Sequence, residues 1–172
     1  VFNGENIVLS KEYERARKIG RVLQDPKMGT CGSLTILENL ALADNKLHPF
    51  GLSPAVNRKR EEHYKKLLES CGMGLENRMG VLAGSLSGGQ RQRVWIAMVI
   101  AQDTKTLFLD EPTTYLDVRY QLQILKLIKK LNRDSGIAVI MVSHDIECAV
   151  ENANKILHLG ERGVEFFGTT ED

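Results

Sequence analysis

Several features that mark membrane, secreted or nucleic-acid-binding proteins are missing from this sequence. Its 23 lysines and arginines face 22 aspartates and glutamates, leaving a formal net charge of +1, so charge gives no reason to expect a nucleic-acid partner. The longest uninterrupted apolar run, Val94 to Ala101, is far shorter than the roughly 20 residues that cross a membrane. The stretch Val1 to Glu5 contains neither the basic region nor the apolar core of a secretory signal. Three scattered cysteines (Cys31, Cys71 and Cys148) predict reduced thiols rather than a disulfide framework or metal site. Together these absences favour the cytosol.

What is present is typical of a globular α/β domain. The 42% hydrophobic and 26% charged content is ordinary for a folded protein, and 172 residues suit one domain with a sizeable core. Short apolar runs predict strands at 7–9, 21–23, 106–109, 137–142, 155–159 and 164–167. Capping and spacing signals predict four helices. The first spans 12–18, and the second begins at a Thr35/Glu38 capping box and ends at about Ala43. The third is a charged segment that ends near Gly72, and the fourth spans 94–101. The two prolines and the glycine of residues 48–54 predict a loop.

The second half of the chain carries the pattern of a parallel crossover unit. Between the strands predicted at 106–109 and 137–142, five apolar residues recur at helical spacing: Val118, Leu122, Leu125, Ile128 and Leu131. A strand, a helix and a strand in this order predict a parallel pair joined by a covering helix. Ligands of such sheets bind beyond the carboxyl ends of the strands.

Polar residues stand where these strands end. Asp110 and Glu111 follow Leu107 to Leu109, and His144 follows the strand predicted at 137–142. An aspartate in this place can hold Mg²⁺ for phosphoryl transfer, and the adjacent glutamate can polarise an attacking water. A neutral imidazole can donate a hydrogen bond to a phosphate oxygen. Taken singly, solvated carboxylates at a strand end and a structural histidine are the simpler interpretations.

The segment Ser87-Gly88-Gly89-Gln90 has the composition of an anion-binding turn. Glycines let a ligand approach the backbone, and amides at a helix N-terminus point toward an anion. The Ser87 hydroxyl adds a donor. Alternatively, a glycine-serine run is simply a flexible loop. We expect a glycine-rich turn that precedes the apolar helix at 94–101.

In their order along the chain, these motifs resemble those of the ATP-binding domain of ABC transporters. Gln24, which follows the strand predicted at 21–23, resembles the Q-loop glutamine, and Leu86 to Gln90 resembles the signature. Leu107 to Glu111, Asp117 and His144 resemble the Walker B strand, the D-loop and the switch histidine. The resemblance covers nearly the whole chain. It implies a P-loop NTPase (RecA-like) α/β core with an inserted helical subdomain. On this basis we expect the helical subdomain with its signature at about 27–100, and the Walker B, D-loop and H-loop part of the core at 101–172.

The resemblance also implies ATP and Mg²⁺ as cofactors and a head-to-tail dimer with a second ABC ATPase domain. Each ATP lies between the Walker A motif of one domain and the signature of the other. The implied catalytic residues are Glu111 and His144, and the implied metal ligands are Asp110 and Gln24. The implied ATP-binding residues are Ser87, Gly88, Gly89, Gln90, Gln24 and Asp117. The signature serves a nucleotide held by the partner, whereas Gln24, Asp110, Glu111 and His144 serve the nucleotide of their own chain.

One element of that family is absent from the 172 residues. No Gly-Lys dipeptide occurs in them, so the Walker A pattern G-x-x-x-x-G-K-S/T is not present. We therefore expect a partial ABC ATPase domain without the N-terminal β-subdomain and the P-loop. Two explanations stay open at this point: a fragment of a longer ATPase, or a half-site.

Details of the motifs point to the importer branch of the family. Arg21 to Ala41 resembles the ATPases of tryptophan-type solute uptake systems, whereas Arg93 to Asp117 is more similar to those of ferric-siderophore and cobalamin importers. The resemblance implies an energy-coupling subunit on the cytoplasmic face of the membrane, with a permease as its partner and no nucleic acid. Two alternatives are a soluble ABC protein of DNA repair or translation, and a non-catalytic interaction fragment.

Overall fold

The structure is a computed structural model that describes residues 2, 4–47, 56–114 and 116–169. The chain divides into two compact units, residues 1–141 and 142–172, and each is described by itself. The loop predicted at 48–54 lies outside the described residues.

A three-stranded sheet forms the centre of the first unit. Its strands are β1 (Ile19–Val22), β2 (Thr106–Asp110) and β3 (Ala138–Val142), in the order β1-β2-β3. β1 and β2 run parallel, with Val22 beside Leu109 at their carboxyl ends. The chain passes from β2 to β3 through the long helix α5 (Val118–Ser135), as the crossover pattern predicts. Because β1 and β2 end side by side, the residues that follow them leave the sheet at the same edge.

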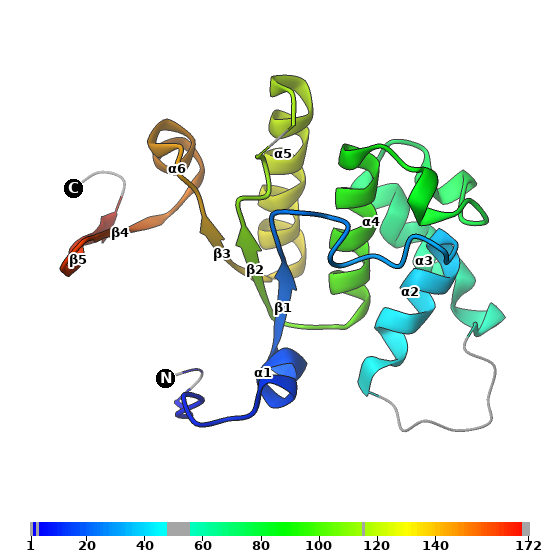
Figure 1. Cartoon of the computed structure of the whole chain (residues 1–172), viewed down its shortest axis with the longest axis horizontal. Helices are drawn as coiled ribbons and strands as arrows, with labels where there is room; N and C mark the ends of the chain where they lie inside the picture. Colours follow the sequence, from blue (N-terminus) through cyan, green and yellow to red (C-terminus); the bar gives the residue numbers. More distant parts are fainter. Residues whose placement is uncertain (1, 3, 48–55, 115, 170–172) are drawn as a thin grey trace. The chain divides into compact units, whose positions relative to one another are not determined.

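Helices make up most of the chain between β1 and β2 (Figure 1). They are α2 (Ile36–Asp44), α3 (Arg58–Cys71) and α4 (Gly88–Ala101), with the short 3-10 helices η1 (Asn45–Leu47), η2 (Leu75–Asn77) and η3 (Ala83–Ser85). A short helix, α1 (Glu12–Lys18), precedes β1. The capping box predicted at Thr35 and Glu38 does open α2. α2 and α3 lie within the range predicted for the helical subdomain, and α4 ends one residue beyond it. The limits at 27 and 100 remain a prediction.

The hydrophobic core surrounds α4, which packs against α2, α3 and β1. Residues Arg91 to Val99 are all buried, so this part of the helix is covered on every side, which fits the apolar composition of Val94 to Val99. At β1 the approach is so close that a Cβ on Gly20 would lie 2.1 Å from Cγ1 of Val99. Only glycine allows α4 to lie this near the strand.

Two local expectations were wrong. Residues 7–9 form no strand: Leu9 is 93% exposed, and the Asn6 side chain accepts a hydrogen bond from the Val8 amide, which favours a turn. The segment 87–90 is not a turn before a helix, because α4 itself begins at Gly88. The helix predicted from the spacing of Val118 to Leu131 is present as α5; its buried residues begin at Ile124, and Val118 and Leu122 are exposed.

The second unit contains α6 (Ile146–Asn152), β4 (Lys155–Gly160) and β5 (Gly163–Thr169). β4 and β5 form an antiparallel hairpin, which confirms the last two strands that the sequence predicts. Among the helices within the described ranges, none combines the length and apolar character needed to cross a membrane.

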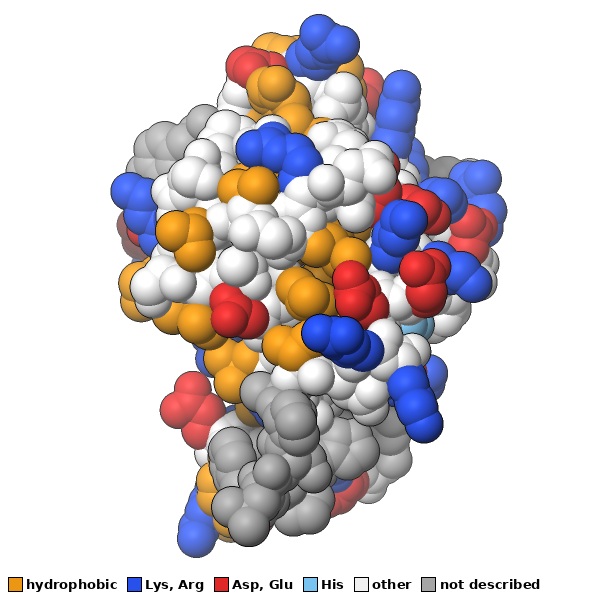
Figure 2. Space-filling view, turned by 90° about the vertical axis from the view of Figure 1, so that its right-hand side faces the viewer, with side chains coloured by type: hydrophobic (Ala, Val, Ile, Leu, Met, Phe, Trp, Pro, Cys, Tyr) orange, Lys and Arg blue, Asp and Glu red, His pale blue; other side chains and the backbone are white. Residues whose placement is uncertain are grey.

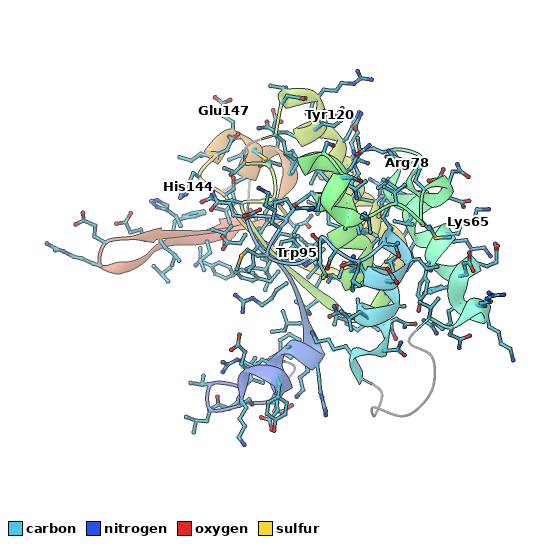
Figure 3. All side chains as sticks on the ribbon, turned by 45° about the vertical axis from the view of Figure 1, so that its right-hand side comes forward. Lys65, Arg78, Trp95, Tyr120, His144 and Glu147 are labelled. Atoms are coloured by element: carbon cyan, nitrogen blue, oxygen red, sulfur yellow. The ribbon has the colours of Figure 1, made fainter. Side chains whose placement is uncertain are left out.

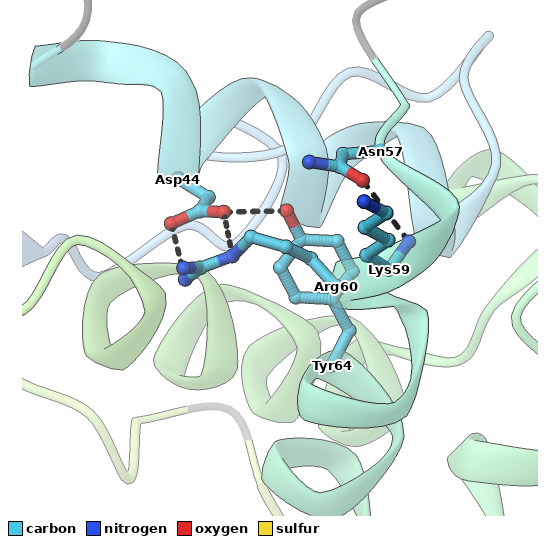
Figure 4. Close-up of polar contacts among 5 residues, drawn as sticks. All are labelled: Asp44, Asn57, Lys59, Arg60 and Tyr64. Atoms are coloured by element: carbon cyan, nitrogen blue, oxygen red, sulfur yellow. Dashed lines mark hydrogen bonds and ion pairs between the residues drawn. The ribbon is translucent and has the colours of Figure 1, made fainter.

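A polar cluster of buried Tyr64, half-buried Asp44 and exposed Arg60 joins the end of α2 to the start of α3 (Figure 4). Both carboxylate oxygens of Asp44 bind the guanidinium of Arg60, at 2.6 and 2.8 Å. The Tyr64 hydroxyl donates to the same carboxylate over 2.6 Å. Burial, and then the hydrogen bond to Asp44, raise the pKa of Tyr64 to about 12.

This cluster gives a testable pH dependence. Above pH ~10 a tyrosine of the unfolded chain loses its proton, while folded Tyr64 keeps its proton up to about pH 12. The unfolded state then binds fewer protons, so the free energy of unfolding falls as the pH rises through this window. We expect Tyr64→Phe to be less stable at pH 7 and to lack this additional loss. Urea unfolding of both proteins between pH 8 and 11.5 measures the difference, and parallel stability curves would contradict the assignment.

Candidate nucleotide site

Three side chains from two strand ends meet at the carboxyl edge of the sheet. Gln24 follows β1 and Glu111 follows β2. Nε2 of Gln24 donates a hydrogen bond to Oε2 of Glu111 over 2.9 Å, and Oγ1 of Thr114 donates to the same oxygen over 3.0 Å. All three residues are half-buried. The structure therefore brings the predicted Q-loop glutamine onto the predicted water-activating carboxylate.

A tight turn explains why Thr114 reaches this carboxylate. The Thr114 amide donates to the Glu111 carbonyl over 3.2 Å, which closes a turn with Pro112 in its second position, where proline is favoured. Glu111 itself has φ +46°, a left-handed conformation that is uncommon outside glycine. Such strain persists only where surrounding contacts hold it, and it clusters at functional sites. Sequence reasoning missed Thr114, although its place three residues after Glu111 was the available signal.

Asp110 and Gln24 offer the oxygen ligands that Mg²⁺ prefers. Asp110 is the last residue of β2 and is half-buried. The amide nitrogen of Gln24 faces Glu111, so its carbonyl oxygen is the atom that suits a cation. Within the described residues, no group of three or more His, Cys, Asp or Glu side chains could hold a metal ion. A carboxylate and an amide oxygen fit an ion that takes its remaining ligands from phosphate oxygens and water, as Mg²⁺ does in nucleotide sites.

The predicted signature forms the capped start of α4. Ser87 is the N-cap: its hydroxyl accepts from the Gln90 amide over 3.4 Å, and the Gln90 side chain accepts from the Ser87 amide over 3.1 Å. Ser87 and Gly88 are exposed, whereas Gly89 is buried. The first turn of a helix carries amides without intrahelical partners and a partial positive charge. This end of α4 is therefore suited to an anion.

Asp117 caps the neighbouring helix. It is the N-cap of α5, and its side chain accepts from the Tyr120 amide over 3.1 Å. A Cβ added at Gly89 would lie 3.8 Å from the Tyr120 ring and 3.9 Å from Leu116. The start of α5 and the signature thus lie side by side, with Tyr120 extending from α5 (Figure 3).

Two buried arginines that follow the signature fix α4 to its surroundings. Nε and Nη2 of Arg91 donate to the Ala83 carbonyl over 2.9 and 2.7 Å. Arg93 donates to the Cys71 carbonyl at the end of α3 and, over 2.7 Å, to Gln123 on α5. Burial lowers the pKa of Arg93. The sequence string predicts a motif here, but only the structure shows that both guanidiniums point inward.

His144 belongs to the second unit, just after β3 and before Asp145, the N-cap of α6. It is exposed. Its predicted place beside the nucleotide of the same chain stays a prediction, as do the roles of the other site residues.

Comparison with known proteins identifies the family. A family model described as "ABC transporter" matches residues 1–114, so the chain belongs to the ATP-binding domains of ABC transporters. The mixed α/β fold with its parallel strand pair agrees with this assignment.

Two curated relatives and one solved structure illustrate the likeness. The chain is 36% identical over 152 residues to the tyrosine transport ATP-binding protein of Clostridioides difficile, covering 87% of this chain and 60% of that protein. It is 35% identical over 179 residues to a petrobactin import ATP-binding protein of Bacillus anthracis, covering 100% and 61%. A dimeric ATP-binding cassette bound to ADP and Pi superposes with a TM-score of 0.70 at 32% identity, covering 92% of this chain and 65% of that one. The chain thus spans about three fifths of the length of these relatives.

Proposed function

We propose that this chain is the signature-bearing part of an ATP-binding subunit that couples ATP hydrolysis to import through a membrane ABC transporter. The observation that carries the proposal is the shared hydrogen bonding of Gln24 and Thr114 to Glu111 at the carboxyl edge of the sheet. The names of the relatives, which concern tyrosine transport and petrobactin import, support an importer.

In this proposal each site residue has one task at the nucleotide of its own chain. Asp110 and Gln24 would hold Mg²⁺, which neutralises charge on the β- and γ-phosphate oxygens. The Glu111 carboxylate, fixed by Thr114, would orient the attacking water and accept its proton. His144 would donate a hydrogen bond to the γ-phosphate.

The signature and Asp117 would act on a nucleotide held by a second ATPase domain in a head-to-tail dimer. Ser87 and Gly88 are exposed at the start of α4 and so are open to a ligand from another domain. The dimeric form of the related cassette supports such a pairing.

A permease is the second proposed partner, with the subunit at the cytoplasmic face of the membrane. The helical part of the first unit exposes apolar side chains that a protein contact would cover: Met28 is 74% exposed, Leu42 55% and Leu82 50%. On the face shown in Figure 2, hydrophobic side chains are accessible between charged ones. Scattered exposed apolar residues are ordinary, so the relatives' names carry this part of the proposal.

The experiment that tests the proposal supplies a phosphate-binding loop. A chimera would join an N-terminal segment that carries a Walker A motif to residues 1–172. We expect this chimera to bind and hydrolyse Mg-ATP. A folded chimera that binds no nucleotide would contradict the proposal.

The 172-residue chain alone is expected to hydrolyse ATP negligibly. The residues contain no Gly-Lys dipeptide, so the loop that wraps the β- and γ-phosphates and its lysine are not among them. This is the one observation that favours the alternative of a non-catalytic half-site. Phosphate release by the purified chain, compared with a protein-free blank, measures the outcome. Tight ATP binding with turnover above the blank would show that the P-loop is dispensable here.

A further inference from the structure

The loop from Gln24 to Thr30 is held together by hydrogen bonds within the loop. The Met28 amide donates to the Asp25 carbonyl over 3.0 Å, which closes a turn with Pro26 in its second position. The Thr30 hydroxyl donates to the Pro26 carbonyl over 2.9 Å. These bonds tie the two ends of the loop together, so that displacement at one end moves the other.

Both ends of this loop are anchored to different parts of the first unit. At its start, Gln24 binds Glu111 after β2. Just beyond its end, the Cys31 amide donates to Oδ1 of Asn39 over 2.8 Å, and Nδ2 of Asn39 donates back to the Cys31 carbonyl over 3.0 Å. Asn39 lies on α2 and is fully buried.

Between these anchors the loop lies directly against the signature helix. A Cβ built on Gly29 would lie 1.8, 2.1 and 2.2 Å from Cε2, Cδ2 and Cζ2 of Trp95. Three ring atoms this close show that the indole lies across the Gly29 backbone. Trp95 is only 6% exposed and lies on α4, two turns after Ser87 (Figure 3). Protein interiors are packed too densely to absorb a shift at such a contact, so they transmit it.

We propose that Trp95 is a positioning residue that couples the Gln24–Thr30 loop to the signature helix. When Gln24 leaves Glu111, Gly29 shifts on the indole and α4 adjusts with it. The Gln24 end belongs to the nucleotide of its own chain and the Ser87 end to that of the partner, so the contact would link the two sites. The link between the two nucleotide sites rests on the proposed function. The coupling of the loop to α4 does not, because it is a property of the chain without nucleotide.

The fluorescence of the indole can measure this coupling, because Trp95 is the only tryptophan of the chain. Acrylamide quenching and the emission maximum would be measured for the nucleotide-free 172-residue protein and for Gln24→Ala. A net hydrogen bond contributes ~1 kcal/mol, so its removal should raise the population of the displaced loop about fivefold. We expect stronger quenching and a red-shifted emission. Glu111→Ala, which removes the acceptor of the same bond, should reproduce this change.

Lys27→Ala is the matched control, because Lys27 lies in the same loop with an exposed side chain. It should leave the quenching unchanged.

Gly29→Ala places a methyl group against the ring and should abolish any further effect of Gln24→Ala. If Gly29→Ala fails to fold by circular dichroism, the Gln24 and Glu111 variants still decide the matter. Wild-type quenching in folded Gln24→Ala, or an equal change in Lys27→Ala, would overturn the proposal. Since no nucleotide is present, this failure is separate from failure of the ATPase chimera.

Discussion

Replacing Glu111 by glutamine in the P-loop chimera is expected to lower ATP turnover ~10²–10⁴-fold, the usual cost of losing a group that accepts a proton in the transition state. Glutamine keeps the side chain's length and an oxygen that accepts from Gln24 and Thr114. Only the negative charge is lost. ATP binding should therefore persist, and the ATP-bound dimer should accumulate because it no longer resolves through hydrolysis.

Two measurements check this expectation. Single-turnover phosphate release gives the rate, and size-exclusion chromatography with Mg-ATP gives the dimer fraction. Asp110→Asn is the matched control, because it alters the adjacent carboxylate at the end of β2. It should weaken Mg²⁺-dependent binding rather than trap the dimer. Turnover near wild type in Glu111→Gln would place the base elsewhere.

The sequence predicts the main elements of the fold because their signals are local. The Thr35/Glu38 box opens α2, and apolar runs at β2 and β3 flank a helix of regular spacing. Residues 7–9 look equally apolar, yet Leu9 is almost fully exposed. A run of three apolar residues does not show what covers it, and the Asn6 side chain decides the local conformation.

The site divides in the same way. The type and order of Gln24, Asp110 and Glu111 are visible in the sequence. Gln24 and Glu111 are 87 residues apart in the sequence. They meet only because β1 and β2 pair in the observed register. For Thr114 the sequence offers only its spacing from Glu111, because the hydroxyl reaches the carboxylate through a turn of the folded chain. The close approach of the Trp95 ring to Gly29 has no sequence signature.

A mixed dimer should separate the two sides of the nucleotide site. The P-loop chimera would carry Ser87→Arg, so that its own homodimer has no working signature. It would be paired with the 172-residue chain, which supplies the only intact signature. Hydrolysis is then expected only in the mixed dimer. Ser87→Arg in the shorter chain should abolish this hydrolysis, because a bulky cation at the exposed N-cap blocks the approach of the γ-phosphate to Gly88 and Gly89.

Ser87→Asp in the shorter chain distinguishes this effect from the loss of the helix cap. Aspartate caps a helix about as well as serine, but its charge would repel the phosphate, so it should also impair hydrolysis. His144→Ala in the same chain should have little effect, because His144 is assigned to the nucleotide of its own chain. If His144→Ala abolished turnover while both Ser87 variants preserved it, the signature would not serve the partner's nucleotide. An effect of Ser87→Arg without one of Ser87→Asp would instead trace to a disturbed start of α4.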